Sequence, residues 1–298
     1  MSCGFPRMSA DAAAASERIA VFGAGRMGCG ISEVCAGVGA TVVVIDRDAD
    51  LLTQATTDLA ARLERRVGRG ELSAADCAAI RERISTSADN AAVGDAQLVI
   101  EAITEDEDAK RALLRDIAPR VADDTSSSSI TRLAAVSGRP ERFIGMHFMN
   151  PAHRMQLVEL IRGIATEDET FAVVKAFVER LGKTAIAAED FPAFIVNRIL
   201  LPMVNEAIYA LYEGVGTVEA IDAGLKLGAN HPMGPLELAD FIGLDVCLSI
   251  MHVLYDGLAD SKYRPCPLLV KYVEAGWLGR KTGRGFYDYS QDPPRPTR

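Results

Sequence analysis

The chain has 298 residues, of which 49% are hydrophobic and 24% charged, and its formal net charge at pH 7 is −9. This composition is typical of a globular protein with one large or two medium domains. It disfavours a nucleic-acid partner, because phosphate contacts need a basic face. It also disfavours a membrane protein, because no apolar run approaches the roughly 20 residues of a span.

The two ends of the chain and its cysteines indicate where the protein works. Residues 1–17 lack the apolar stretch of a signal peptide and are expected to form a flexible leader. The proline-rich residues 291–298 are expected to form a flexible tail. The six cysteines show no metal-binding spacing. We therefore expect buried free thiols, a cytoplasmic location and no metal site.

The first part of the chain alternates apolar strands with helices. A strand at residues 18–22 is followed by a glycine loop, a helix at residues 27–38 and a strand at residues 41–45 that ends on Asp46. This order is the one a dinucleotide-binding unit requires. Further strands are predicted at residues 98–103, 143–146, 157–161 and 184–188, and further helices at residues 49–69, 73–83, 107–117 and 170–181. Apolar strands without alternation indicate a parallel sheet that is covered on both faces.

From residue 191 onward the pattern is helical. The hydrophobic periodicity predicts helices at residues 194–212, 218–227, 235–258 and 267–275. We therefore predict the α/β fold class. A Rossmann-type doubly wound sheet domain over residues 18–190 is followed by an all-helical domain over residues 191–290.

The glycine loop carries the first functional signal. Gly23 allows a tight turn, Gly25 lets the backbone approach a pyrophosphate, and Gly28 lets the helix pack closely on the strand. The helix N-terminus then offers N–H groups to phosphate. The alternative is a glycine-rich loop of another α/β fold. Asp46 would accept hydrogen bonds from ribose hydroxyls and favours NAD, although the adjacent Arg47 leaves NADP open.

The second signal is a histidine followed by a carboxylate twelve residues later. His147 lies in the segment GMHFMNP and Glu159 in the segment LVELIRG. Histidine suits a base for alcohol oxidation, and a carboxylate behind it fixes the imidazole tautomer and orientation. The alternatives are a structural histidine and a solvated glutamate.

Several long segments resemble one family. These are GAGRMGCGIS, LVIEAITED, GMHFMNP with LVELIRG, DFPAFIVNRILLPMVNEA, KLGANHPMGPLELADFIGLD and GRKTGRGFYDY. The chain resembles the 3-hydroxyacyl-CoA dehydrogenases over nearly its whole length, and within them the short bacterial 3-hydroxybutyryl-CoA dehydrogenases. The resemblance implies reversible NAD-dependent oxidation of a 3-hydroxyacyl thioester to the 3-ketoacyl thioester. It also implies a homodimer formed through the helical domain.

The resemblance assigns roles to single residues. His147 would be the general base and Glu159 its partner. Ser126 would lie near the substrate hydroxyl and the nicotinamide, and Asn197 would position the substrate oxygens. The positions that match family cofactor contacts are Glu105, Lys110, Asn150 and Lys281. The positions that fall near the coenzyme A phosphates are Arg62 and Arg69.

Simpler interpretations remain open for some of these residues. The two arginines could belong to the solvated face of a helix, and Lys281 could be a surface charge. Asn197 could form a hydrogen bond between helices. His231, in the segment ANHPMGP, is interpreted as structural.

The chain departs from the family pattern just before Ser126. Family members carry an apolar strand there, whereas residues 120–125 offer only Val121 and Ala122 together with two aspartates that are costly to bury. Either the preceding helix unwinds to supply a poor strand, or the sheet loses one. This departure keeps open a dinucleotide-binding relative without activity. The polar pair His153 and Arg154 keeps open a hydroxyacyl group carried by acyl carrier protein.

Overall fold

The computed structural model describes residues 17–119, 124–125 and 130–298, which form two compact units divided between Asp190 and Phe191. The expected leader at residues 1–16 lies outside the described residues. Glu17 is described, and its carbonyl accepts a hydrogen bond of 2.8 Å from the Thr41 amide.

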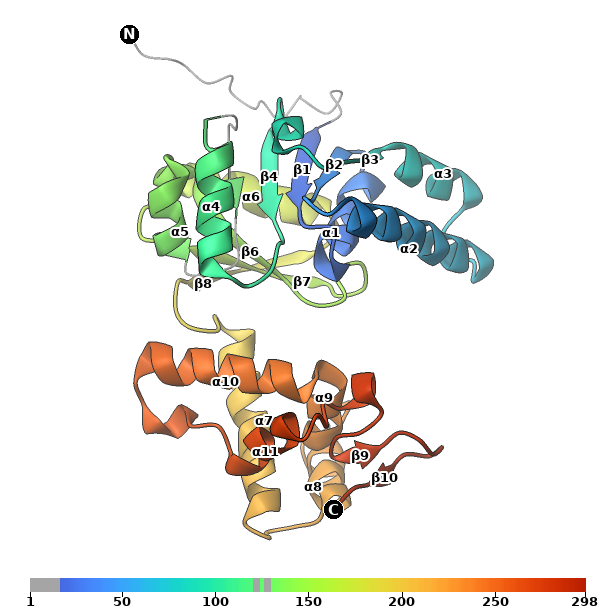
Figure 1. The fold of residues 1–298 in the computed structure, drawn as a ribbon, viewed down its shortest axis with the longest axis vertical. Coiled ribbons are helices and arrows are strands. Elements are labelled where there is room, and N and C mark those ends of the chain that lie inside the picture. The colour runs from blue at the N-terminus through green and yellow to red at the C-terminus, as the bar shows by residue number, and fades with distance from the viewer. Residues whose placement is uncertain (1–16, 120–123, 126–129) are drawn as a thin grey trace. The chain divides into compact units, whose positions relative to one another are not determined.

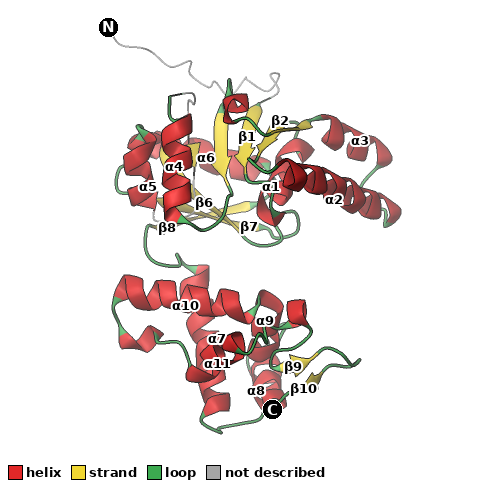
Figure 2. Cartoon of the chain, in the orientation of Figure 1, coloured by secondary structure: helices red, strands yellow, loops and turns green. Residues whose placement is uncertain are grey.

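The first unit is a layered α/β structure built on an eight-stranded sheet (Figures 1 and 2). Its elements are β1 (Arg18–Phe22), α1 (Arg26–Gly37), β2 (Thr41–Ile45), α2 (Ala49–Gly68), α3 (Ala74–Glu82), β3 (Ile84–Ser87), β4 (Leu98–Glu101), α4 (Glu107–Ile117), β5 (Asp124–Thr125), α5 (Ile130–Ser137), β6 (Phe143–Phe148), β7 (Leu157–Arg162), α6 (Asp168–Arg180) and β8 (Thr184–Glu189). The strand order is β3-β2-β1-β4-β5-β6-β7-β8. The predicted Rossmann-type sheet is therefore confirmed.

Strand direction reverses once in this sheet. The neighbours from β3 through β6 pair in parallel, β6 and β7 pair antiparallel, and β7 and β8 pair in parallel. Buried apolar residues of β1, β2 and β4 pack against α1 and α2 in one continuous core. The glycine loop and Asp46 thus lie at the carboxyl ends of adjacent parallel strands, where ligands bind in open α/β sheets.

The strand that the sequence put in doubt is present among the described residues. Strand β5 has two residues, Asp124 and Thr125, which pair with β4 on one side and β6 on the other. Helix α4 still ends at Ile117, so it has not unwound to supply the strand. The sheet therefore keeps a strand between β4 and β6.

Strand β3 was not predicted. Its sequence, ISTS, has a single apolar residue, and three of its four positions are polar. An edge strand with little apolar surface gives no period-2 signal, which explains the omission.

The second unit is helical, as predicted. It contains α7 (Val196–Tyr212), α8 (Val218–Ala223), a π-turn at Gly224–Gly228, α9 (Pro235–Ile242), α10 (Leu244–Leu258), α11 (Pro267–Glu274) and the short strands β9 (Tyr287–Asp288) and β10 (Arg295–Pro296). Strand β10 lies within the segment expected to be a flexible tail and pairs with β9.

The predicted single helix at residues 235–258 is wrong. Gly243 adopts a φ of +105° and separates α9 from α10, which are bent by 97°. A Cβ at Gly243 would also lie 3.2 Å from the Lys281 Nζ. The apolar period continues through the break, so the helical pattern alone could not reveal it. Within the described ranges no single helix is long and apolar enough to span a membrane, and α9 and α10 pass that test only as a bent pair.

The five described cysteines are free and buried, as expected. Among the described residues, no group of three or more His, Cys, Asp or Glu side chains is arranged to hold a metal ion.

Candidate active site

The glycine loop between β1 and α1 has the geometry of a dinucleotide site. Gly23 has a φ of +103°, and a Cβ there would lie 2.4 Å from the Ala102 carbonyl oxygen. A Cβ on Gly28 would lie 1.9 Å from the Gly23 carbonyl oxygen. At Gly25, by contrast, no atom of the described residues lies within 4 Å of where a Cβ would be. Two glycines are thus required by close packing, and the third leaves open space beside the helix N-terminus.

The beginning of α1 fits an anionic ligand. No side chain caps this helix end, and its first turn contains no acidic residue. Its amide groups and the positive end of the helix dipole therefore favour a phosphate. Asp46 at the end of β2 accepts hydrogen bonds from the Ala24 amide (2.9 Å) and the Asp48 amide (3.1 Å), which fixes its carboxylate beside the loop. These residues fit the pyrophosphate and ribose of NAD.

Lys110 and Glu105 form part of a second group of charged residues, which lies after the carboxyl end of β4. The buried Lys110 ammonium lies 3.1 Å from the Glu101 carboxylate and 3.2 Å from the Glu105 carboxylate. The Glu105 side chain is 71% exposed, whereas Glu101 is buried and also accepts a hydrogen bond from the Ile103 amide. Lys110 therefore orders the turn after β4, and its contact with a cofactor stays a prediction.

The structure brings His147 and Glu159 together. They face each other in the antiparallel register of β6 and β7. The His147 Nδ1 lies 2.6 Å from the Glu159 Oε2. The Glu159 side chain is fully buried, while the His147 side chain keeps 24% of its surface exposed. A buried carboxylate thus holds one imidazole nitrogen, and the imidazole remains accessible.

The loop between β6 and β7 is held by a lysine that sequence reasoning missed. The Lys183 ammonium donates to the carbonyl oxygens of Ala152 and Met155, each at 2.7 Å. Burial lowers the pKa of Lys183, and the nearby Cys35 opposes this shift. Asn150, which precedes a cis proline peptide bond, begins this loop. Lys183 directly precedes β8 and lies about thirty residues from the loop that it holds. No local sequence motif therefore indicates this contact.

The two arginines near the expected coenzyme A contacts behave differently. Arg62 donates through Nε to Glu33 at 2.6 Å and is 21% exposed. Arg69 is 67% exposed and lies 4.0 Å from Glu71. Arg69 therefore fits the solvated-face interpretation, whereas Arg62 is fixed by a buried carboxylate that the sequence did not reveal.

Ser126 lies outside the described residues. The helix that follows it, α5, begins at Ile130, and the Asp190 carboxylate accepts hydrogen bonds from the amides of Ile130 (3.1 Å) and Thr131 (2.9 Å). Asp190 thus anchors the chain just after the serine segment. Its separation of about sixty residues from α5 hides it from sequence reasoning.

The remaining predicted residues belong to the second unit. Asn197 lies in the first turn of α7 and is half-buried. The Lys281 ammonium contacts both Asp245 carboxylate oxygens, at 2.5 and 2.6 Å. The His231 amide donates to the Leu225 carbonyl, in keeping with a turn residue. Their roles in the site stay predictions.

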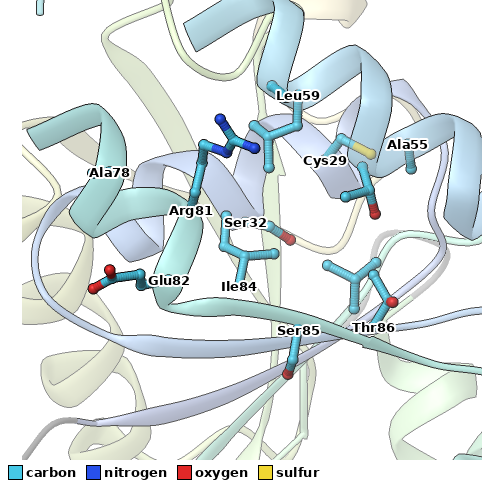
Figure 3. Close-up of a pocket in the computed structure, with 13 residues that line it drawn as sticks. Cys29, Ser32, Ala55, Leu59, Ala78, Arg81, Glu82, Ile84, Ser85 and Thr86 are labelled. Carbon is cyan, nitrogen blue, oxygen red and sulfur yellow. The ribbon is translucent and has the colours of Figure 1, made fainter. Parts of the chain in front are cut away.

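A cavity of about 510 Å³ lies beside α1, and Cys29, which follows Gly28, is among its lining residues. It is enclosed by α1, α2, α3 and the strands β2 and β3, and Figure 3 shows Leu59, Ala55 and Ile84 among its lining side chains. Its lining is mostly apolar and contains none of the predicted site residues. The cavity therefore does not define the active site.

The Rossmann-type sheet, the glycine loop and the paired histidine and glutamate together define an NAD-dependent dehydrogenase. Comparisons with known proteins agree. Residues 18–191 match the family model for the 3-hydroxyacyl-CoA dehydrogenase NAD binding domain, and residues 194–289 match the model for its C-terminal domain. The chain belongs to the 3-hydroxyacyl-CoA dehydrogenase family.

Individual relatives are similar over nearly the whole chain. A 3-hydroxybutyryl-CoA dehydrogenase of Bradyrhizobium diazoefficiens is 59% identical, covering 96% of this chain and 100% of that protein. A probable 3-hydroxybutyryl-CoA dehydrogenase of Bacillus subtilis is 52% identical, covering 92% and 98%. The crystal structure of (S)-3-hydroxybutyryl-CoA dehydrogenase from Ralstonia eutropha is 47% identical, covers 93% of this chain and 100% of that chain, and has a TM-score of 0.89.

Proposed function

We propose that this protein oxidises (S)-3-hydroxybutyryl-CoA reversibly to acetoacetyl-CoA, with NAD as the cofactor. The observation that carries the proposal is the 2.6 Å contact between the His147 Nδ1 and the buried Glu159 carboxylate. The close relatives, which bear the name of this activity, support the choice of substrate.

The geometry supports a general base at His147. An ionised carboxylate only accepts hydrogen bonds, so the proton of a neutral imidazole resides on Nδ1 and the lone pair on Nε2. The Nε2 atom takes the proton of the substrate hydroxyl, and Glu159 stabilises the imidazolium that results. In the reverse direction the same nitrogen returns the proton to the carbonyl oxygen. The C3–H bond breaks as the C3–O double bond forms.

NAD supplies the acceptor for the hydride that leaves C3. The amides at the start of α1 would hold its pyrophosphate, and Asp46 would hold the adenosine ribose. Lys110 keeps the turn that carries Glu105 in place. Asn150, Asn197, Lys281 and Ser126 are proposed, on resemblance, to complete the cofactor and substrate contacts.

The first experiment is to mix the protein with NADH and acetoacetyl-CoA and to follow absorbance at the reduced-nicotinamide band. Steady loss of absorbance is the expected result. Binding of NADH without loss of absorbance would contradict the proposal and favour a relative that has lost turnover.

The acyl carrier is proposed to be coenzyme A. The relatives' names support this choice over acyl carrier protein. Turnover of acetoacetyl groups on coenzyme A and on acyl carrier protein should be compared at equal concentration. Faster turnover on the carrier protein would overturn the choice.

We also propose a homodimer formed by the second unit. Large apolar side chains on its helices are at least 39% exposed, namely Ile195, Ile199, Phe241, Val246, Val253 and Tyr255. Exposed apolar patches of this kind mark protein interfaces. Light scattering should give twice the mass of the 31.9 kDa chain. The cytoplasmic location stays a prediction.

A further inference from the structure

A buried glutamate links α1 to α2. The Glu33 side chain is 2% exposed, and its two oxygens accept from different residues of α2. Arg62 donates through Nε at 2.6 Å, and Arg66 donates through Nη1 at 2.7 Å. The two arginines are four residues apart and share one helix face, where their like charges would otherwise repel. Glu33 therefore fixes the position of both guanidinium groups.

The arginines keep donors that Glu33 does not use. The Arg62 Nη2 is buried and has no hydrogen-bond partner among the described residues. The side chains of Arg62 and Arg66 remain 21% and 28% exposed. Glu71 lies 3.9 Å from the Arg66 Nε and 4.0 Å from Arg69, so three arginines surround two carboxylates and leave a net positive charge. A buried unpaired donor beside a net positive charge indicates an anionic ligand.

The loop after β6 contributes to the same region. A Cβ at Gly30, one turn before Glu33, would lie 3.3 Å from the Ala152 Cβ, so this loop packs on α1. His153 and Arg154 follow directly. Burial lowers the pKa of His153, and Arg62 and Arg66 act in the same direction while Glu33 opposes them. This shift favours the neutral imidazole, whose N–H can still donate to an anion.

We propose that Glu33 is a positioning residue that presents Arg62 and Arg66 to the phosphate groups of coenzyme A, and so sets the preference for coenzyme A thioesters over shorter ones. The inference rests on the proposed function. It extends the expected phosphate contact of Arg62 to Arg66, and it assigns to Glu33 the alignment of both side chains. A bidentate phosphate contact depends on such alignment.

The test compares acetoacetyl-CoA with acetoacetyl-pantetheine, which has the same reacting group and lacks the phosphates. In Glu33→Gln the KM for acetoacetyl-CoA should rise about 10-fold, because freed guanidinium groups must be ordered again on binding. The kcat for both thioesters and the KM for acetoacetyl-pantetheine should stay within about 2-fold. The Kd of free coenzyme A, measured by calorimetry, should rise with the KM.

Two further variants keep the test decisive. Glu64→Gln removes an exposed α2 carboxylate that lies 3.6 Å from Arg81, and it should change neither KM. Arg66→Gln leaves the Glu33–Arg62 pair in place and should raise the KM for acetoacetyl-CoA alone, which gives a second result if Glu33→Gln does not fold.

The remaining outcomes separate the inference from the proposed function. An unchanged or lower KM for acetoacetyl-CoA in folded Glu33→Gln, or an equal rise for both thioesters, would overturn the positioning role while the proposed function stands. A wild-type protein that reduces neither thioester would overturn both.

Discussion

The two units of this protein bury acidic side chains in different ways. In the first unit, buried Glu33, Glu101 and Glu159 each contact a basic side chain. In the second unit, buried Asp222 and Asp240 accept hydrogen bonds from backbone amides and tyrosine hydroxyls. Paired acids hold cations in place, whereas acids with neutral donors hold loops in place. Of these five buried acids, only Glu159 holds a side chain that we propose to take part in the reaction.

The largest effect is expected at His147. His147→Gln removes the proton acceptor and should lower kcat for 3-hydroxybutyryl-CoA by about 10³- to 10⁴-fold. Binding of NADH, followed by its fluorescence, should not change. His252→Gln, at an exposed histidine of α10, is the matched control and should keep full activity. Retained turnover in the His147 variant would end the assignment of the base.

The next effect is expected at Lys110. Lys110→Met leaves the buried Glu101 carboxylate without its cation and should lower the free energy of unfolding by about 3–4 kcal/mol. Urea unfolding measures this loss. Lys175→Met breaks an exposed pair with Glu179 and should cost less than about 0.5 kcal/mol. An equal loss of unfolding free energy in the two variants would show that burial does not make the Lys110 ion pair more important for stability than the exposed pair.

A smaller effect on catalysis is expected at Glu159. Glu159→Gln keeps the side-chain size but removes the charge that stabilises the imidazolium, so kcat should fall about 10²-fold. The change should appear in kcat more than in KM, because the charge develops in the transition state. A variant with wild-type kcat would show that Glu159 is only structural.

Some of the features behind these predictions could be predicted from the sequence, and others could not. The glycine loop, Asp46 and the register partners His147 and Glu159 were predictable, because each belongs to a local motif. Glu33 and Asp190 were not, since their partners are about thirty and sixty residues away and only the tertiary fold brings them close. Gly243 was also missed, because an apolar helical period survives a bend that a single φ angle creates.

The smallest effect is expected at Asp240 and depends on pH. Burial raises the pKa of Asp240 to about 6 from its ordinary value of 3.8, while hydrogen bonds from Phe286, Tyr287 and Tyr289 oppose the shift. The native state therefore binds this proton more tightly than the unfolded state does. The contribution of the group to stability is fully present below pH 3.8 and is lost as pH rises through about 6.

Asp240→Asn tests this expectation. The unfolding free energy of the wild type minus that of the variant should decrease between pH 4 and pH 7, because the variant has no titrating group at this position. Urea unfolding at several pH values measures the difference. A difference that grows with pH would show that the native environment prefers the ionised carboxylate.

The reversal of strand direction between β6 and β7 has a consequence for how the chain brings His147 and Glu159 together. It lets a single hairpin supply both residues of the proposed proton-transfer pair, twelve residues apart in the chain. Loop-closure entropy for so short a segment is small, so little of the chain must be ordered to bring the two side chains together. The proposed base and its partner carboxylate therefore come from one short segment of the chain. A change of length in another strand therefore leaves the twelve-residue spacing of this pair unaltered.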